Sequence, residues 1–200
     1  NNIGYFNKKK NIFRLFNGIH ETNNFGHYYH GNSWKIYCNK IRKDIDFFDE
    51  KYRETWDGKI MGLSAYGKSK KVENIKDYTT SKDLSYNEFP YIIFESKHFA
   101  LKNPDEQAYI LQNNFENALV DYFNELKRLN YLEENICVAG GSFLNVLGNS
   151  RLKKLGYNIH IPPCTNDSGL HFGAACYGVF LSKQKITLPK NIALLGKKYC

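Results

Sequence analysis

Two adjacent glycines stand where a short apolar run gives way to a helix-like segment, in the stretch Val138 to Asn145. The first N–H groups of a helix lack partners within it, and the helix dipole adds partial positive charge there. Because glycine has no Cβ, a phosphate can approach the backbone of Gly140 and Gly141 closely. Ser142 adds a hydroxyl donor, and the Asn145 amide on the next turn can contact a ribose or a base. The alternative is a tight turn between strand and helix that binds nothing.

A single carboxylate, Asp167, follows the loop Cys164 to Asn166 and precedes another helix-like segment. In that position its side chain predicts an N-terminal cap, which uses one carboxylate oxygen. The second oxygen stays available to a hard divalent cation such as Mg²⁺ or Fe²⁺. Asp167 is therefore a candidate metal ligand as well as a cap.

Three further side chains can bind ligands, and each also has a simpler explanation. Lys59 follows Gly58 and can meet a phosphate as a point charge, or it can be a solvated cation. His27 and His30 lie three residues apart, but no third ligand is evident near them. Packing and hydrogen bonding therefore explain the two histidines as well as a metal does.

The composition favours a water-soluble, intracellular protein. The formal net charge is +8, but the lysines are scattered and no nucleic-acid-binding module accompanies them. The chain has no run of about 18 apolar residues, so we do not expect a membrane span. The five cysteines lack C-x-x-C spacing, which favours reduced cytosolic thiols over disulfides or a zinc site, so we expect a cytoplasmic location.

The first hundred residues give few clear elements. Ile3 to Phe6 and Ile12 to Phe16 flank a polar turn and predict a hairpin. Residues 18–57 are rich in aromatic residues and asparagine without a clear period, which predicts short helices and loops. Residues 68–88 are polar and predicted to be exposed, and Tyr91 to Phe94 predicts a strand.

The second half predicts alternating helices and strands, which is typical of an α/β domain. The clearest helix runs from Asn103 to Asn130, with Asn103 as its cap and Glu106 completing a capping box. An apolar stripe marks its buried face. The stripe consists of Ala108, Leu111, Phe115, Ala118, Leu119, Tyr122, Leu126 and Leu129.

Two further helices and two strands follow in the predicted order. The strands span Ile136 to Ala139 and Tyr157 to Ile161. Between them a helix is predicted from Ser142 to Leu155, with Gly156 as its stop. The last helix is predicted from Ser168 to Lys183, and its glycines and alanines would let another backbone approach closely.

Three stretches together resemble the NodU-type O-carbamoyltransferases. Residues 58–67, G-K-I-M-G-L-S-A-Y-G, are similar to the family's G-K-V-M-G-L-A-x-Y-G. Residues 139–145, A-G-G-S-F-L-N, are similar to A-G-G-V-A-L-N, and residues 166–175, N-D-S-G-L-H-F-G-A-A, to G-D-A-G-x-A-x-G-A-A. Order and separations also agree. Residues 24–29 resemble S-L-G-x-x-Y more weakly, and residues 195–200 resemble the L-G-P-x-Y-S that ends the family's N-terminal domain.

The resemblance implies an α/β fold of the actin-like ATPase (ribonuclease H-like) type, related to the tRNA threonylcarbamoyl transferase. It implies an enzyme that uses carbamoyl phosphate and ATP, forms a carbamoyl-adenylate in a separate C-terminal domain, and carbamoylates the hydroxyl of a sugar or natural product. A divalent metal, Fe or Mg, would lie beside the reacting group. The motifs assign nucleotide binding to Gly140, Gly141, Ser142, Asn145, Lys59 and Gly62, and metal binding to Asp167.

The chain also departs from the family pattern. The family's H-x-x-x-H metal pair and first acidic strand lie upstream of the hairpin, and the adenylate-forming domain would follow Cys200. We therefore expect residues 1–200 to be the later part of the N-terminal domain, inactive by itself. Phe143 replaces a small residue and Asn166 a glycine. Two alternatives remain, an actin-like kinase-type protein that transfers phosphoryl groups and a basic nucleic-acid binder.

Overall fold

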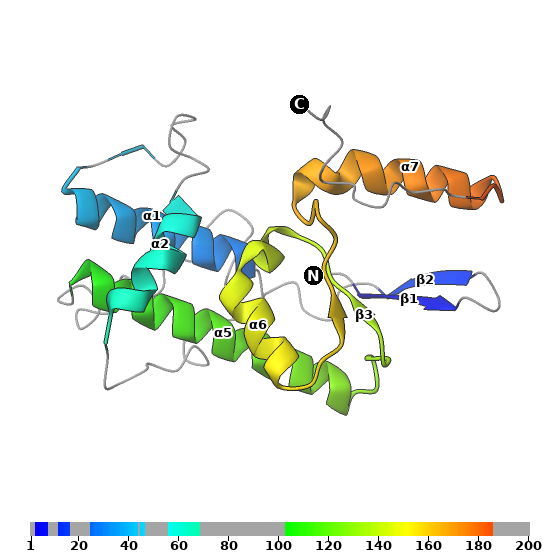
Figure 1. Ribbon diagram of the computed structural model, residues 1–200, viewed down its shortest axis with the longest axis horizontal. Helices are drawn as coiled ribbons and strands as arrows, with labels where there is room; N and C mark the ends of the chain where they lie inside the picture. The colour runs from blue at the N-terminus through cyan, green and yellow to red at the C-terminus, as the bar shows by residue number, and fades with distance from the viewer. Residues whose placement is uncertain are drawn as a thin grey trace, which may run out of the picture. The chain divides into compact units, whose positions relative to one another are not determined.

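The computed structural model describes residues 3–7, 12–16, 25–43, 45–46, 56–68 and 103–185 (Figure 1). The chain divides into two compact units, residues 1–119 and residues 120–200. The long helix α5 (Pro104–Arg128) contributes its first part to the first unit and its last turns to the second.

An antiparallel hairpin begins the first unit, and the sequence prediction of it is confirmed. Strand β1 (Ile3–Asn7) pairs with β2 (Ile12–Phe16), with Ile3 opposite Phe16 and Asn7 opposite Ile12. Two apolar runs separated by a few polar residues were enough to indicate this pairing.

Helix α1 (Phe25–Ile41) is a single long helix, so the prediction of short helices and loops over residues 18–57 is wrong here. Its asparagines, glycines and aromatic residues favour a helix poorly. Packing compensates, because the Tyr29 ring meets the Phe115 ring of α5 edge-on at a centroid distance of 5.1 Å. Ile36, two turns along α1 from Tyr29, is completely buried. Packing against α5 and α2 thus stabilises a helix that its residue types favour poorly.

Helix α2 (Trp56–Leu63) and the 3₁₀ turn η1 (Ser64–Tyr66) carry the glycine-punctuated motif. The indole of Trp56 is completely buried at the start of α2. Gly67 ends the motif where α5 passes, and a Cβ at this position would collide with the carbonyl of Asp105. The absence of a side chain at Gly67 therefore allows this segment to lie against α5.

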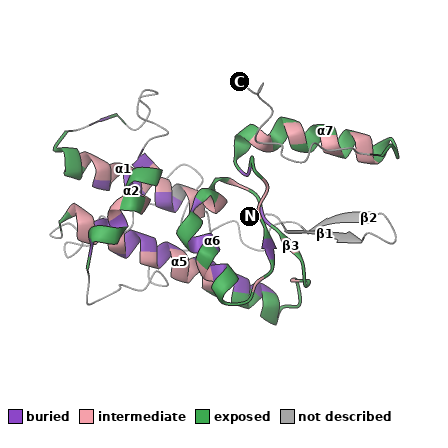
Figure 2. Cartoon of the chain, viewed as in Figure 1, coloured by how far each residue is buried: buried purple, intermediate pink, exposed green. Residues whose placement is uncertain are grey.

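Helix α5 confirms the longest helix that the sequence predicts. The Oδ1 atom of Asn103 accepts a hydrogen bond from the Glu106 backbone N–H at 2.9 Å, which is the predicted cap. Most of the predicted apolar stripe is buried along α5 (Figure 2). The fully buried members are Ala108, Leu111, Phe115, Leu119 and Leu126. Leu129 is an exception, 37% exposed, because it lies just beyond the end of the helix.

A β-α-β unit follows α5 in the second unit. Strand β3 (Ile136–Cys137) pairs in parallel with β4 (Ile159–His160), and helix α6 (Val146–Lys154) lies between them in the chain. Parallel pairing requires such a crossover connection. Both strands lie within the predicted ranges but are shorter than predicted.

Helix α6 starts later than the predicted Ser142. Residues Gly141–Leu144 form a 3₁₀ turn, η3, and α6 begins only after it. Asn145 is the cap of α6, since its Oδ1 atom accepts a hydrogen bond from the Gly148 backbone N–H at 2.9 Å. A capping side chain three residues further along displaces the helix start from Ser142.

The predicted stop of α6 at Gly156 is confirmed. Gly156 has a φ of +90°, a left-handed conformation that glycine adopts without a steric penalty. Its N–H donates to the Lys153 carbonyl at 3.0 Å, and the Tyr157 N–H donates to the Leu152 carbonyl at 3.2 Å. These two bonds form the Schellman motif that ends many helices.

Helix α7 (Leu170–Leu181) follows a 3₁₀ turn, η4 (Asp167–Gly169), so the predicted start at Ser168 is too early. Asp167 lies inside η4 and does not cap α7, which corrects the capping prediction. Gly169 occupies the cap position, where an added Cβ would collide with the Cys164 carbonyl.

The small residues of α7 do not pack against another backbone within the described ranges. Gly173 and Gly178 have nothing within 4 Å of an added Cβ, and no residue of α7 is buried (Figure 2). The predicted close approach is therefore observed at Gly169 alone among the described glycines of this segment.

The described residues form a mixed structure that is mainly helical, and the predicted alternation of helices and strands is confirmed from α5 to α7. None of the described helices combines the length and the apolar character that crossing a membrane requires. Three predictions concern residues outside the described ranges. They are the exposed segment after Lys68, the strand Tyr91 to Phe94 and the closing motif Leu195 to Cys200.

Candidate functional site

The corner between β3 and α6 carries backbone donors that can bind an anion. The Gly140 N–H is already used, because it donates to the Thr165 carbonyl at 2.5 Å. Within the described ranges, the N–H groups of Gly141 and Ser142 donate to no protein acceptor. Gly141 is exposed and Ser142 half-buried, so both lie within reach of a ligand from solvent. The corner offers two backbone donors and the Ser142 hydroxyl.

The two glycines of this corner, Gly140 and Gly141, differ in why the position is a glycine. Gly140 has a φ of +110°, which residues with a side chain rarely adopt, so the backbone itself requires glycine. Gly141 has no positive φ, and an added Cβ there would meet nothing within 4 Å. Neither conformation nor packing explains Gly141, in contrast to Gly67 and Gly169. A glycine without either reason fits a backbone that a ligand approaches.

The helix dipole contributes less at this corner than the sequence suggested. The 3₁₀ turn η3 separates Gly140 from α6, which begins at Val146. The dipole effect falls off within the first turn of a helix. An anion at Gly141 would therefore be bound by individual N–H groups, as in the backbone anion sites called nests.

The loop that carries Asp167 lies against the same corner. The hydrogen bond from Gly140 to Thr165 joins the two loops two residues before Asp167. The Asp167 side chain is exposed in η4 and open to solvent. Both loops follow the carboxyl ends of parallel strands, which is where ligands bind in open α/β sheets. The structure therefore brings the predicted phosphate site and the predicted metal ligand to one end of the β3–β4 pair.

Asn145 has a structural role in addition to any role in binding. Its side chain is buried, and its Oδ1 atom is occupied by the cap bond to Gly148. This bond therefore fixes Asn145, the residue between η3 and α6, at the start of α6. The contact between its amide and a nucleotide stays a prediction.

Lys59 and Gly62 belong to the first unit, on helix α2. Both are exposed, and an added Cβ at Gly62 would meet nothing within 4 Å. The Lys59 Nζ atom donates to the Tyr37 hydroxyl at 3.2 Å and lies 4.9 Å from the centre of the Tyr37 ring. Tyr37 therefore holds the Lys59 ammonium, and Lys59 forms no ion pair with another described residue.

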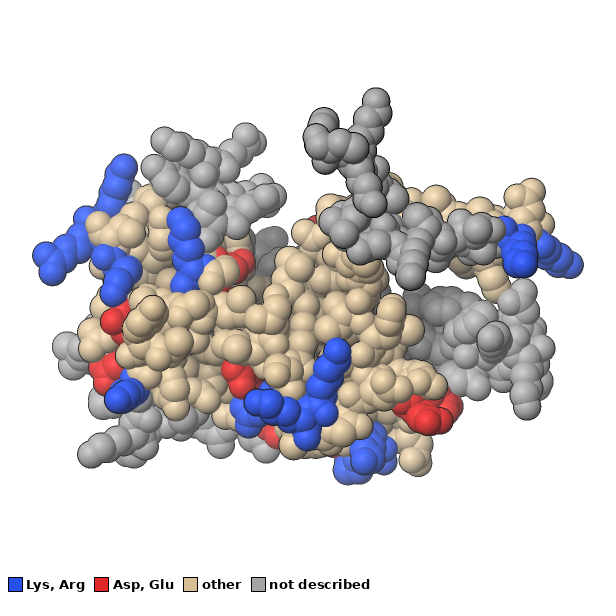
Figure 3. All heavy atoms as spheres, viewed as in Figure 1, with Lys and Arg blue, Asp and Glu red and all other residues tan. Residues whose placement is uncertain are grey.

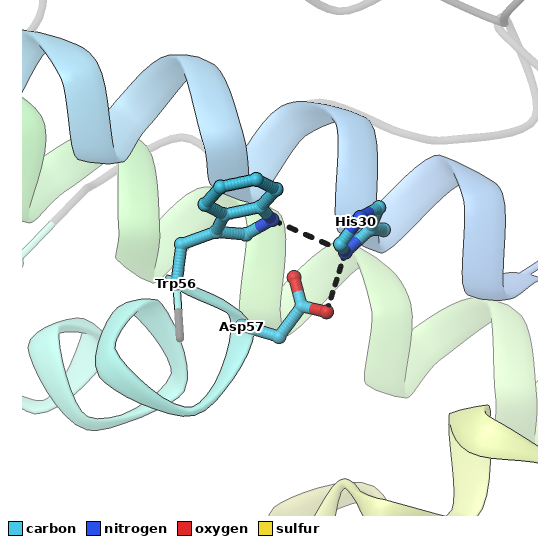
Figure 4. A network of polar contacts seen from close by, with 3 residues as sticks. All are labelled: His30, Trp56 and Asp57. Atoms are coloured by element: carbon cyan, nitrogen blue, oxygen red, sulfur yellow. Dashed lines mark hydrogen bonds and ion pairs between the residues drawn. The ribbon is translucent and has the colours of Figure 1, made fainter. Parts of the chain in front are cut away.

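A polar contact that sequence reasoning missed connects His30 of α1 to the first residues of α2 (Figure 4). The Nδ1 atom of His30 lies 2.7 Å from the Asp57 Oδ2 atom and 3.1 Å from the Trp56 Nε1 atom. Nδ1 carries either a hydrogen or a lone pair, so it cannot serve both partners. An ionised carboxylate only accepts, so the shorter contact places the hydrogen on Nδ1, pointing to Asp57. Histidine and aspartate lie 27 residues apart, and no local pattern links them.

The metal site is incomplete within the described ranges. No group of three or more His, Cys, Asp or Glu side chains is placed there to hold a metal ion. Asp167 supplies one exposed carboxylate oxygen donor, and a divalent metal needs further ligands beside it. His30 contacts Asp57 instead, and the His27 side chain lies outside the described residues. The four described cysteines are free thiols.

On the face shown in Figure 3, the described lysines and arginines do not form one patch, and acidic side chains also lie on that face. Two of the cations are paired, Lys40 with Asp105 at 2.7 Å and Arg128 with Glu125 at 2.6 Å. The geometry thus gives no specific support to nucleic-acid binding.

Comparison with known proteins places this site in a family context. A family model described as "Carbamoyltransferase N-terminus" matches residues 4–176. Nodulation protein U of Sinorhizobium fredii (strain NBRC 101917 / NGR234) is 35% identical over 107 residues, which are 52% of this chain and 17% of that protein. Nodulation protein U of Rhizobium fredii is 48% identical over 60 residues, 29% of this chain and 10% of that protein. The chain thus covers less than a fifth of the length of these relatives. No solved structure matches it.

Proposed function

The chain belongs to the family of carbamoyltransferase N-termini, of the type found in nodulation protein U, and we propose that it is part of an enzyme that carbamoylates a hydroxyl group. The acceptor would be a small molecule, a sugar or another natural product. Family membership supports the reaction class, and the geometry of the corner supports the placement of the reacting phosphate.

The donor in this proposal is carbamoyl phosphate, which reacts with ATP to form a carbamoyl-adenylate and releases phosphate and pyrophosphate. An adenylate-forming domain of the same polypeptide would make this intermediate, and residues 1–200 would be the later part of an actin-like N-terminal domain. The greater length of the relatives supports a further domain. The parallel β3–β4 pair with its helical crossover is compatible with an actin-like domain.

The observation that carries the proposal is the junction between the two loops. The Gly140 to Thr165 bond keeps the open amides of Gly141 and Ser142 beside the loop of Asp167. The two amides suit a phosphate, and the Asp167 carboxylate suits the cation that accompanies this phosphate. In this proposal the amides and the Ser142 hydroxyl would bind the phosphate, and Asp167 would be one of the metal ligands.

The chemistry requires charge stabilisation more than acid or base strength. The acceptor hydroxyl oxygen bonds to the carbamoyl carbon and releases its proton to solvent, the bond from that carbon to the phosphate oxygen breaks, and AMP leaves. Negative charge grows on the phosphate, and the N–H groups of Gly141 and Ser142 would stabilise it without reorganising. A bound divalent metal would stabilise the same charge as a Lewis acid.

The test uses the complete protein with carbamoyl phosphate, ATP, a divalent metal and a panel of hydroxyl acceptors. The expected product is an O-carbamoylated acceptor, detected by a mass gain of one carbamoyl group, together with AMP. A phosphorylated acceptor that forms without carbamoyl phosphate would establish phosphoryl transfer instead. Absence of both products with a metal-loaded, folded protein would refute carbamoyl transfer.

A further inference from the structure

Two polar contacts hold the Asp57-Gly58-Lys59 segment of α2 on helix α1. His30 contacts the Asp57 carboxylate at 2.7 Å, and the Tyr37 hydroxyl accepts a hydrogen bond from Lys59 at 3.2 Å. His30 and Tyr37 lie seven residues apart, two turns of helix, and thus on one face of α1. The two contacts lie on either side of Gly58 in the sequence.

The charges of this segment are not paired with each other. Asp57 and Lys59 are close in sequence, but the carboxylate contacts His30 (Figure 4) and the ammonium contacts a phenol. Among the described residues no carboxylate forms an ion pair with Lys59, whereas Lys40 on α1 pairs with Asp105 at 2.7 Å. No carboxylate among the described residues therefore neutralises the charge of Lys59.

The Tyr37 side chain fixes this charge without cancelling it. Its hydroxyl accepts one N–H of Lys59, and its ring face lies 4.9 Å from the Nζ atom. A phenol and a π face are neutral partners, so they orient an ammonium and leave its charge available. Lysine loses much side-chain freedom when it binds a ligand, and an ammonium that is already oriented loses less.

We propose that Tyr37 is a positioning residue that presents the Lys59 ammonium to the phosphoryl oxygens of ATP or carbamoyl phosphate. His30 supports this by holding Asp57, so that the carboxylate does not neutralise Lys59. The inference rests on the proposed function for the identity of the two substrates. The phosphoryl group is their shared chemistry, and the kinetics toward each substrate distinguish them.

The test is a double-mutant cycle in the complete protein with Tyr37→Phe and Lys59→Gln. Loss of a charge-assisted contact should raise the KM of one phosphorylated substrate about 10- to 100-fold in Lys59→Gln, with a smaller effect on kcat. Tyr37→Phe keeps the ring, removes the hydroxyl, and should raise the same KM roughly two- to tenfold. In the Lys59→Gln background, Tyr37→Phe should have no further effect, since Tyr37 acts through Lys59.

Matched variants separate positioning from folding. Lys68→Gln removes another exposed lysine of the first unit, and Tyr177→Phe removes the hydroxyl of an exposed tyrosine on α7. Both should leave the KM values unchanged. The inference is overturned if the fold-increases in KM of Tyr37→Phe and Lys59→Gln multiply in the double variant. It is also overturned if Tyr37→Phe keeps the wild-type KM values.

Calorimetric titration with ATP separates this inference from the proposed function. If the wild-type protein binds ATP but transfers no carbamoyl group, a non-additive cycle in Kd supports the inference while the reaction class fails. If the protein transfers carbamoyl groups and neither substitution alters KM or Kd, the inference alone fails. A protein that neither binds nor turns over a phosphorylated substrate would overturn both.

Discussion

The backbone N–H of Gly140 donates to the carbonyl oxygen of Thr165 at 2.5 Å, and this bond joins the loops of the predicted phosphate and metal sites. Gly140 makes the bond with a φ of +110°, whereas its neighbour Gly141 leaves its N–H open to solvent. The backbone conformation therefore requires glycine at position 140 only, and the proposed phosphate contact concerns Gly141.

Substitution of the two glycines by alanine should show this separation. Gly140→Ala forces a side chain into an extended conformation with positive φ that is nearly restricted to glycine, and should lower the free energy of unfolding by about 1–3 kcal/mol. Gly141→Ala should change it by no more than about 0.5 kcal/mol, because the added Cβ meets open space. Urea unfolding of both variants measures the difference, and equal losses of stability would contradict it.

The same pair should behave differently toward ATP. An alanine at Gly141 places a methyl group where a phosphate would approach the backbone, so ATP affinity should fall while stability is retained. Calorimetric titration of the complete protein checks this. Unchanged ATP affinity in Gly141→Ala would mean that the phosphate does not bind at this corner.

Asn145 should show its capping role independently of binding. Asn145→Ala removes the acceptor for the Gly148 N–H and should cost about 1 kcal/mol of stability. Asn145→Asp keeps a capping oxygen and should retain most of the stability, but it loses the amide donor and adds a negative charge near the phosphate. Weaker ATP binding at preserved stability would support a nucleotide contact, and unchanged binding in Asn145→Asp would limit Asn145 to the cap.

Asp167 should matter for activity and little for folding. Its side chain is exposed and caps no helix, so Asp167→Asn should change stability by less than about 0.5 kcal/mol. Loss of a residue that only hydrogen-bonds a metal ligand typically lowers metal affinity or activity about 10- to 100-fold. Because Asp167 would bind the metal directly, Asp167→Asn should lower metal affinity and carbamoyl transfer by about this factor or more. Asp121→Asn, another exposed carboxylate of the second unit, is the matched control. Wild-type metal content in Asp167→Asn would exclude it as a ligand.

Tyr157 should contribute a loss of stability at alkaline pH. Its hydroxyl donates to Asn124 Oδ1 at 2.7 Å, and partial burial raises the pKa of the phenol above its ordinary value of about 10. The folded state therefore holds this proton more tightly than the unfolded state. The corresponding stability is present below about pH 10 and is lost as the pH rises through the folded pKa.

Tyr157→Phe should reduce that alkaline loss. At pH 8 it should also cost about 0.5–1.5 kcal/mol for the lost hydrogen bond. Urea unfolding at pH 8 and at about pH 10.5 measures both effects. Tyr177→Phe, which removes the hydroxyl of an exposed tyrosine, is the control, and an equal pH dependence in wild type and Tyr157→Phe would refute the assignment.

Features that depend on neighbouring residues were predictable from the sequence. The cap of α5 at Asn103 and the stop of α6 at Gly156 both involve partners within five residues, so residue type and spacing were sufficient. The start of α6 shows the limit of this reasoning. Ser142 and Asn145 are both good caps in sequence, and only the backbone shows that Asn145 is the one used.

Helix α1 shows why the first unit was harder to predict. Its residues favour a helix weakly, and its stability comes from contacts such as that between Tyr29 and Phe115 on α5. The contacts of His30 with Asp57 and of Tyr37 with Lys59 depend on the same packing of α1. Sequence reasoning treated His30 as half of a histidine pair and Lys59 as a phosphate contact or a solvated cation. It missed Asp57 and Tyr37 as their partners, because these residues are far away in the chain.

The sequence by itself determined the family, the glycine motifs and the order of helices and strands from α5 to α7, since these depend on residue types at short spacings. Only the tertiary structure decided which amides of the corner stay open, which residue caps α6 and α7, and which side chains hold Asp57 and Lys59. Those outcomes depend on long-range hydrogen bonds and packing, whose partners are brought together by chain folding and not by local spacing.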